Sequence, residues 1–175
     1  MNWILKIKHW QIFLLLTPFM IMSSVEFEDN IENLYLINLG GIIVLLLWSF
    51  LLTEELIKII PKDFNLKTNF YYFNAIICFA TITAITIIYE GEETEFSGIY
   101  ALIGFYIFYA FLQSFGFAGR IIKSMELNRN SKKRESIGYF FLFIFLPIGI
   151  WFLQPKINKL NKNRTEEKTP TANTV

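Results

Sequence analysis

Four long apolar runs that contain no charged residue dominate this sequence. They cover residues 10–25, 34–52, 70–89 and 99–117. A helix needs about 20 apolar residues to cross a hydrocarbon core of roughly 30 Å, and about 17 is the lower limit. The last three runs meet this length, and the first meets it when it extends past Lys6 and Lys8, whose long side chains reach the interface. We therefore predict an all-α integral membrane bundle with four spanning helices.

The composition agrees with a bilayer as the solvent. Hydrophobic residues make up 54% of the 175 residues and the mean hydropathy is +0.42, whereas soluble domains average about 45–50% apolar residues even with glycine counted. Aromatic residues make up 18%, which suits lipid-facing and interfacial positions. We expect one membrane domain over residues 1–155. The stretch 156–175, rich in Asn, Lys and Thr, is predicted to be a disordered basic tail.

A cleaved signal peptide is the alternative interpretation of the first apolar run. The letters "KIKHW" have the charge of an n-region, and "IFLLLTPFMIM" has the character of an h-region. The following "MSSVE" offers small serines without an A-x-A cleavage pattern. A retained membrane helix is therefore favoured, with Trp3 and Trp10 in an interfacial belt.

The connections between the runs differ in charge. The first and third carry only acidic charges: Glu26, Glu28, Asp29 and Glu32, then Glu90, Glu92, Glu93 and Glu95. The second and fourth carry the basic residues Lys58, Lys62, Lys67, Arg120, Lys123, Arg129, Lys132, Lys133 and Arg134. Cytoplasmic loops collect Lys and Arg. We therefore predict that the N-terminus and the basic connections are cytoplasmic and that the acidic loops are external.

Residues 137–153 form a fifth apolar stretch, which either crosses the membrane or enters it and turns back. Re-entry keeps all 16 basic residues inside, whereas a fifth span moves those of the tail outside. The stretch rises only about 25 Å as a helix. It contains Pro147 and Gly149, so "LPIG" suits an apex between two half-helices. A re-entrant or interfacial segment is favoured. A kinked fifth spanning helix is the alternative, because membrane helices tolerate proline and glycine.

Weakly polar stripes lie on three of the predicted spans. The candidates for helix packing or for the lining of a pore are Asn38, Gly41, Asn74, Thr81, Tyr109, Gln113 and Gly116. Helical spacing places Cys78 on the face of Asn74, and Tyr106 on the face of Gln113. Small and polar residues at such spacing indicate close helix–helix packing, which is the favoured interpretation. A polar seam along a solute path is the alternative.

Ionisable residues are absent from the interior of the predicted spans. Such residues usually mark proton relays and pumps. The single histidine, His9, adjoins Trp10 at the interface, and the single cysteine, Cys78, suits a buried hydrophobic position. The acidic loops match no EF-hand spacing. We therefore expect no enzymatic activity, no cofactor, no bound metal and no nucleic-acid partner.

At "PIGIWFLQPKINKL" and at "KHWQIFLLL" the chain resembles small multi-pass membrane proteins of Bacteroidota-type bacteria, which have no assigned activity. The resemblance covers both ends and the general helix plan, and it supplies no site residues. We expect a protein of the bacterial cytoplasmic (inner) membrane that acts as a non-enzymatic accessory or scaffold subunit. Its partners would be the lipid bilayer and a protein partner or further copies of itself. The alternative is an oligomeric pore or small-solute permeation protein, with "LPIG" near the path.

Overall fold

The computed structural model describes residues 3–23, 31–61, 63–64, 66–89 and 98–168. Every regular element in these ranges is a helix. The elements are α1 (His9–Ser23), α2 (Ile31–Ile59), α3 (Thr68–Tyr89), α4 (Ile99–Leu127), the 3-10 helix η1 (Lys133–Ser136), α5 (Ile137–Ile144) and α6 (Leu146–Lys168). The all-α prediction is therefore confirmed for the described part of the chain.

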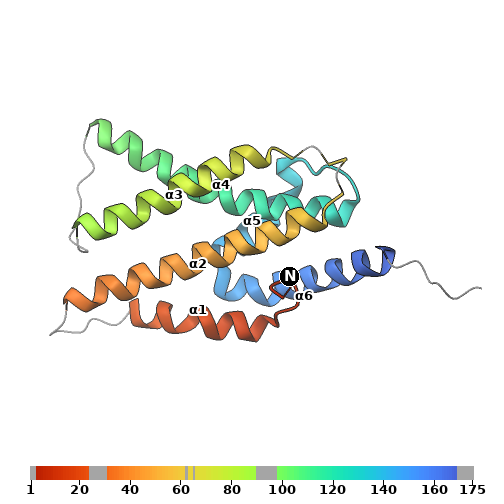
Figure 1. Cartoon of the computed structure of the whole chain (residues 1–175), viewed down its shortest axis with the longest axis horizontal. Coiled ribbons are helices and arrows are strands. Elements are labelled where there is room, and N and C mark those ends of the chain that lie inside the picture. The colour runs from red at the N-terminus through yellow and green to blue at the C-terminus, as the bar shows by residue number, and fades with distance from the viewer. Residues whose placement is uncertain (1–2, 24–30, 62, 65, 90–97, 169–175) are drawn as a thin grey trace, which may run out of the picture.

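The first four helices run roughly along the long axis of the molecule and alternate in direction (Figure 1). The junction of α1 with α2 lies at the same end as the junction of α3 with α4. We call this the distal end. By sequence its connections are the acidic ones, and their structure lies outside the described residues. The opposite end, formed by residues 3–8, 57–61, 63–64, 66–67 and 120–136 and the C-terminal half of α6, is called the basic end.

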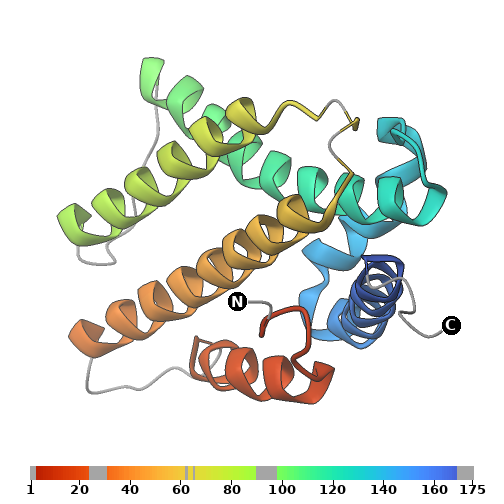
Figure 2. The same cartoon turned by 45° about the vertical axis from the view of Figure 1, so that its right-hand side comes forward.

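Helices α5 and α6 form a hairpin that enters the bundle from the basic end and returns to it. The chain runs inward along α5, turns at Phe145 and runs back out along α6 (Figures 1 and 2). Helix α5 has eight residues, about 12 Å of rise, which is too short to cross the bundle. The helical path breaks at Phe145, where φ is -91° and ψ is 51°.

The residues of the predicted apex build this turn. Pro147 lies in the first turn of α6, where its missing N–H costs little. The Gly149 N–H donates to the Phe145 carbonyl oxygen at 2.7 Å. A Cβ atom on Gly149 would lie 1.8 Å from the Leu142 carbonyl oxygen, so glycine lets the two helices touch backbone to backbone. The break itself precedes Pro147 by two residues.

The prediction of a disordered tail from residue 156 is wrong as far as Lys168. Helix α6 continues through Pro155 to Lys168, and residues 169–175 lie outside the described ones. The physical reason is an apolar stripe at helical spacing: Leu153 and Ile157 are completely buried, and Leu160 packs against the same core. The average composition of this segment is dominated by Lys and Asn and does not show the apolar stripe. The packing of the stripe against the core stabilises the helix.

Helices α2 and α4 are longer than the apolar runs from which they were predicted. Each has 29 residues, about 44 Å of rise, and each extends into the basic end. The extensions are amphipathic. Leu56 on α2, and Ile121, Ile122 and Met125 on α4, are buried, so both extensions belong to the packed part of the molecule.

The main hydrophobic core lies toward the basic end, where residues 4–5, α1, α2, α4, α5 and α6 meet. Farther from it, α3 and α4 expose large apolar side chains. Among the described residues, two helices are long and apolar enough to cross a membrane, in the segments Thr68–Ile85 and Ala101–Leu127. Their length and composition support membrane association.

Candidate functional site

Asn74 on α3 is completely buried and binds two side chains of α4. The Tyr106 hydroxyl donates to Asn74 Oδ1 at 2.8 Å. Asn74 Nδ2 donates to Gln113 Oε1 at 3.3 Å. Tyr106 and Gln113 lie two helical turns apart on one face of α4, and both bind Asn74. We call these three residues the polar cluster. Interhelical hydrogen bonds of this kind hold membrane helices in register.

The other residues singled out in the sequence lie in several places. Tyr109 and Gly116 join Gln113 in the wall of a pocket beside α4. Gly41 on α2 and Thr81 on α3 are half-buried and belong to neither group. Asn38 lies in α2, and its side chain lies outside the described ones. The structure therefore brings most of the α3 and α4 candidates together and leaves Gly41 of α2 apart.

The pocket beside α4 has a volume of about 650 Å³ and lies between α3, α4, η1 and α5. Three basic residues line it at the basic end: Lys67, Arg120 and Lys133. The Arg120 Nε donates to the Ser131 carbonyl oxygen at 3.1 Å, which fixes the position of the guanidinium. Among the described residues, no carboxylate lies within ion-pair distance of these three side chains. We call this hollow the basic pocket.

The remaining wall of the basic pocket is largely apolar. It is formed by Phe70 of α3, Leu112, Phe117 and Gly116 of α4, and Ile137 and Phe140 of α5. Tyr109 and Gln113 add polar atoms farther from the basic end. The basic side chains are therefore confined to one end of the pocket, whereas apolar side chains line its length and Tyr109 and Gln113 lie farther from the basic end.

A second cavity of about 300 Å³ lies between α2, α3 and α4. Cys78 lines it and is buried, as the sequence predicted for this residue. Ser114 also lines it, and its hydroxyl donates to the Ala110 carbonyl oxygen of its own helix at 3.0 Å. Because that hydroxyl is satisfied within α4 and the other walls are mainly apolar, this cavity offers little polar recognition.

Glu126 near the end of α4 joins three helices, and the sequence analysis assigned it no role. Lys156 Nζ on α6 donates to Glu126 Oε1 at 2.5 Å, and Lys123 Nζ donates to Oε2 at 2.9 Å. The Tyr139 hydroxyl on α5 donates to the same Oε2 at 3.1 Å. The hydrogen bond with Glu126 raises the pKa of Lys156. The i,i+3 spacing of Lys123 and Glu126 is visible in the sequence, whereas the contact with Lys156 requires the hairpin.

Residues 3–8 are held against α6 by two amide side chains that the sequence analysis also missed. Gln154 Nε2 donates to the Ile4 carbonyl oxygen at 3.1 Å. Asn158 Nδ2 donates to the Ile7 carbonyl oxygen at 3.3 Å. The side chain of Ile4 is buried in the core. The segment that precedes α1 is therefore part of the packed structure at the basic end.

The connection from α4 to η1 is internally bonded. Asn128 ends α4 in the left-handed conformation with φ 51°. The Arg129 guanidinium donates to both carboxylate oxygens of Glu135, at 2.7 and 3.1 Å. This hydrogen bonding, together with that from the Lys132 N–H, lowers the pKa of Glu135 to about 2. The basic connection predicted to be cytoplasmic thus has a defined shape.

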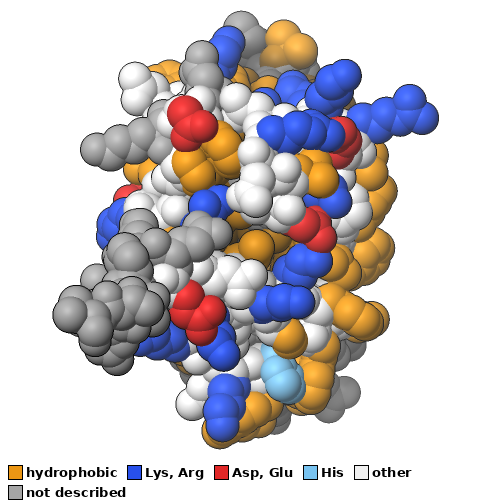
Figure 3. Space-filling model, turned by 90° about the vertical axis from the view of Figure 1, so that its right-hand side faces the viewer, with side chains coloured by type: hydrophobic (Ala, Val, Ile, Leu, Met, Phe, Trp, Pro, Cys, Tyr) orange, Lys and Arg blue, Asp and Glu red, His pale blue; other side chains and the backbone are white. Residues whose placement is uncertain are grey.

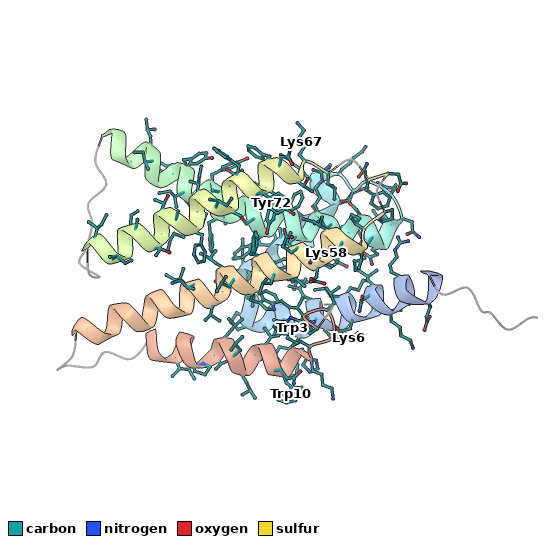
Figure 4. The ribbon with its side chains drawn as sticks, viewed as in Figure 1. Trp3, Lys6, Trp10, Lys58, Lys67 and Tyr72 are labelled. Atoms are coloured by element: carbon teal, nitrogen blue, oxygen red, sulfur yellow. The ribbon has the colours of Figure 1, made fainter. Side chains whose placement is uncertain are left out.

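Aromatic and basic side chains occur together around the basic end. The residues labelled in Figure 4 lie in the half of the molecule nearest this end: Trp3, Lys6, Trp10, Lys58, Lys67 and Tyr72. Figure 3 looks onto the end itself, where Lys and Arg side chains spread over the face with some Asp and Glu among them, and hydrophobic side chains lie along its edge and in patches between the charged ones. Trp and Tyr are enriched at membrane interfaces, and Lys and Arg on the cytoplasmic side.

The described residues hold no group of three or more His, Cys, Asp or Glu placed to bind a metal ion. His9 lies against Trp151, with 4.5 Å between the ring centroids. The polar cluster and Glu126 hold helices together by hydrogen bonds. The positive charge of the basic pocket suits the binding of an anion. Comparison of the chain with protein-family models, curated proteins and solved structures finds no match.

Proposed function

We propose that this chain is a four-span protein of the bacterial cytoplasmic membrane and works as a non-enzymatic scaffold or accessory subunit. Helices α1 to α4 are the spans, the basic end faces the cytoplasm, and the α5–α6 hairpin is re-entrant. The polar cluster carries the proposal, because Asn74 joins α3 to α4 through both of its polar atoms. Both polar atoms of Asn74 are thereby committed to helix pairing and are not available to bind a passing solute.

Exposed apolar side chains support the placement in a membrane. Phe105 and Leu102 on α4 are 72% and 68% exposed, and Ile88 on α3 is 71% exposed. A soluble monomer rarely exposes contiguous apolar patches larger than a few hundred Å². Lipid, or the apolar helix of a partner, is the environment in which such a surface is stable.

The two ends of the bundle support the orientation. The hairpin returns α6, with Lys156, Lys159 and Lys162, to the end that already holds the other basic connections. The positive charge then lies on one side of the membrane. Cytoplasmic segments of membrane proteins are enriched in Lys and Arg in the same way.

Single-cysteine labelling tests this arrangement. Cysteines placed at the exposed positions Gly98, Asn130 and Asn163, in a Cys78→Ser background, are treated with a membrane-impermeant maleimide in intact cells. We expect labelling at position 98 alone, and labelling at all three positions after the cells are permeabilised. A label at position 163 in intact cells would mean that the chain crosses the membrane a fifth time.

Photocrosslinking tests the scaffold role. A photoreactive amino acid replaces Phe105 on α4 or, as the matched control, the similarly exposed Leu14 on α1. We expect a saturable, discrete protein adduct at position 105 and none at position 14. An adduct of the chain with itself at position 105 would indicate a homo-oligomer. Lipid adducts alone at both positions would contradict the scaffold role.

A pore is the second candidate function, and the hollow lined by Tyr109, Gln113 and Gly116 favours it. In this case purified protein in liposomes conducts a small solute, and Gly116→Leu or Pro147→Ala changes the rate. Liposomes that stay tight at high protein density contradict it.

A further inference from the structure

We infer that the basic pocket binds an anionic phospholipid, with its phosphate on Lys67, Arg120 and Lys133 and one acyl chain along the apolar wall. The inference rests on the membrane placement proposed above and adds a ligand to it. The ligand would be a structural lipid that fills the space between α3, α4 and α5.

The charge of the pocket argues for the phosphate. Its three basic side chains come from separate elements, with Lys67 just before α3, Arg120 on α4 and Lys133 on η1, and they line one hollow. No described carboxylate neutralises them. Arg120 is already positioned by its bond to the Ser131 carbonyl oxygen, so less side-chain entropy is lost when an anion binds. Uncompensated positive charge at a membrane surface attracts anionic headgroups.

The shape of the pocket argues for the acyl chain. Arg120 and Tyr109 mark its extent along α4, and eleven residues of helix rise about 16 Å. One leaflet is half of a hydrocarbon core of roughly 30 Å, so the two lengths match. Phe70, Leu112 and Phe140 provide the apolar wall over this length. A free inorganic phosphate would leave that wall empty, whereas a phospholipid contacts both the basic residues and the apolar wall.

Lipid titration of the full-length protein by native mass spectrometry tests the inference. The probes are phosphatidylglycerol and phosphatidylcholine with identical acyl chains. We expect wild-type protein to retain phosphatidylglycerol preferentially. The triple variant K67Q/R120Q/K133Q should bind it about 100-fold more weakly, since each basic residue near the surface contributes about 1 kcal/mol.

A matched variant controls for net charge. K6Q/K8Q/K159Q also removes three positive charges, from residues 3–8 and from α6, which do not line the pocket. Figure 4 places Lys6 and Lys67 on opposite sides of the molecule. We expect this variant to bind phosphatidylglycerol within about twofold of wild type. An equal loss in both triple variants would overturn the inference in favour of unspecific surface charge.

Two further variants keep the test valid if loss of the Arg120 contact disturbs folding. K67Q/K133Q changes two exposed side chains and should weaken binding about 30-fold. Gly116→Leu keeps every charge and fills the apolar part, where a Cβ atom would lie 3.7 Å from Phe140 Cδ2. It should weaken phosphatidylglycerol binding. Inorganic phosphate that displaces phosphatidylglycerol at comparable concentration would show an anion site without a chain and would overturn the lipid inference.

Vesicle flotation separates this inference from the proposed function. Wild-type protein that does not float with phosphatidylcholine and phosphatidylglycerol vesicles refutes the membrane placement itself. Protein that floats, but whose phosphatidylglycerol binding is unchanged in the pocket variants, refutes the lipid site alone.

Discussion

Replacement of Gly149 by alanine perturbs the closest backbone contact between α5 and α6. The added Cβ atom would lie 1.8 Å from the Leu142 carbonyl oxygen and 2.6 Å from its carbonyl carbon. Both are backbone atoms, so no side-chain rotation relieves the overlap. The hairpin has to open, and Ile150 and Leu153, which are completely buried just beyond the turn, have to move with α6.

The expected loss follows from this geometry. Overpacking in a well-packed interior costs about 1–3 kcal/mol, and an overlap with backbone belongs at or above the upper end of that range. A loss of about 3 kcal/mol lowers the melting temperature of a protein of this size by roughly 6–12 °C.

Neighbouring glycines provide a graded set of controls in the same detergent-solubilised protein. A Cβ atom on Gly138 of α5 meets no atom within 4 Å, and one on Gly119 of α4 lies 3.0 Å from Tyr139 Cβ. Gly138→Ala should therefore be neutral or stabilising by up to about 1 kcal/mol through helix propensity, and Gly119→Ala should fall between the other two.

Thermal unfolding monitored by circular dichroism gives the order directly. If the Gly149→Ala and Gly138→Ala proteins have the same melting temperature, the close contact between α5 and α6 is refuted, and with it the turn at Phe145.

Three further perturbations address the contacts that join the helices. Asn74→Leu removes both hydrogen bonds of the polar cluster and should lower the free energy of unfolding by about 1 kcal/mol. Tyr106→Phe removes one of them and should lower it by about half as much. Denaturant titration measures both losses, and equal stability of the wild-type protein and the two variants would contradict the pairing. Glu126→Gln should cost about 1 kcal/mol at low salt and less at high salt, and a double-mutant cycle with Lys156→Gln should show coupling, since the two side chains share a hydrogen bond. The pKa of Glu135 is lowered to about 2 from its ordinary value of 4.5, chiefly by Arg129, so its contribution is fully present above pH 4.5 and is lost as the pH falls toward 2. The protection factor for amide exchange in the α4–η1 connection, taken relative to the intrinsic rate at each pH, should fall over that window, and Glu135→Gln should remove this fall.

The positions of the long helices could be predicted because their apolar runs are uncharged and about as long as a bilayer is thick. Their ends could not. Helix α2 continues past Leu52 through Glu54, Glu55 and Lys58, residues that lie outside its uncharged run. Thr53 and Leu56 are completely buried on the face that packs into the core, and this tertiary packing outweighs the local charge.

The polar cluster was partly predictable and the basic pocket was not. Helical spacing placed Tyr106 and Gln113 on one face of α4, and the structure joins both to Asn74. Lys67, Arg120 and Lys133 are separated by more than fifty and by thirteen positions along the chain. Only the fold brings them to one hollow, because no local pattern links the start of α3 to η1.

The hydrogen bond from Gln154 to the Ile4 carbonyl oxygen joins residues 150 positions apart, and this has a consequence for the order of assembly. The ribosome delivers residues 4 and 5 long before α6, so the buried sites of Ile4 and Leu5 cannot be completed until α6 has been synthesised. Until then α1 and the turn before it lack their final neighbour. The docking of α6 onto residues 3–8 is then a late step of folding, and a chain truncated before α6 leaves the Ile4 carbonyl oxygen without its hydrogen-bond partner Gln154.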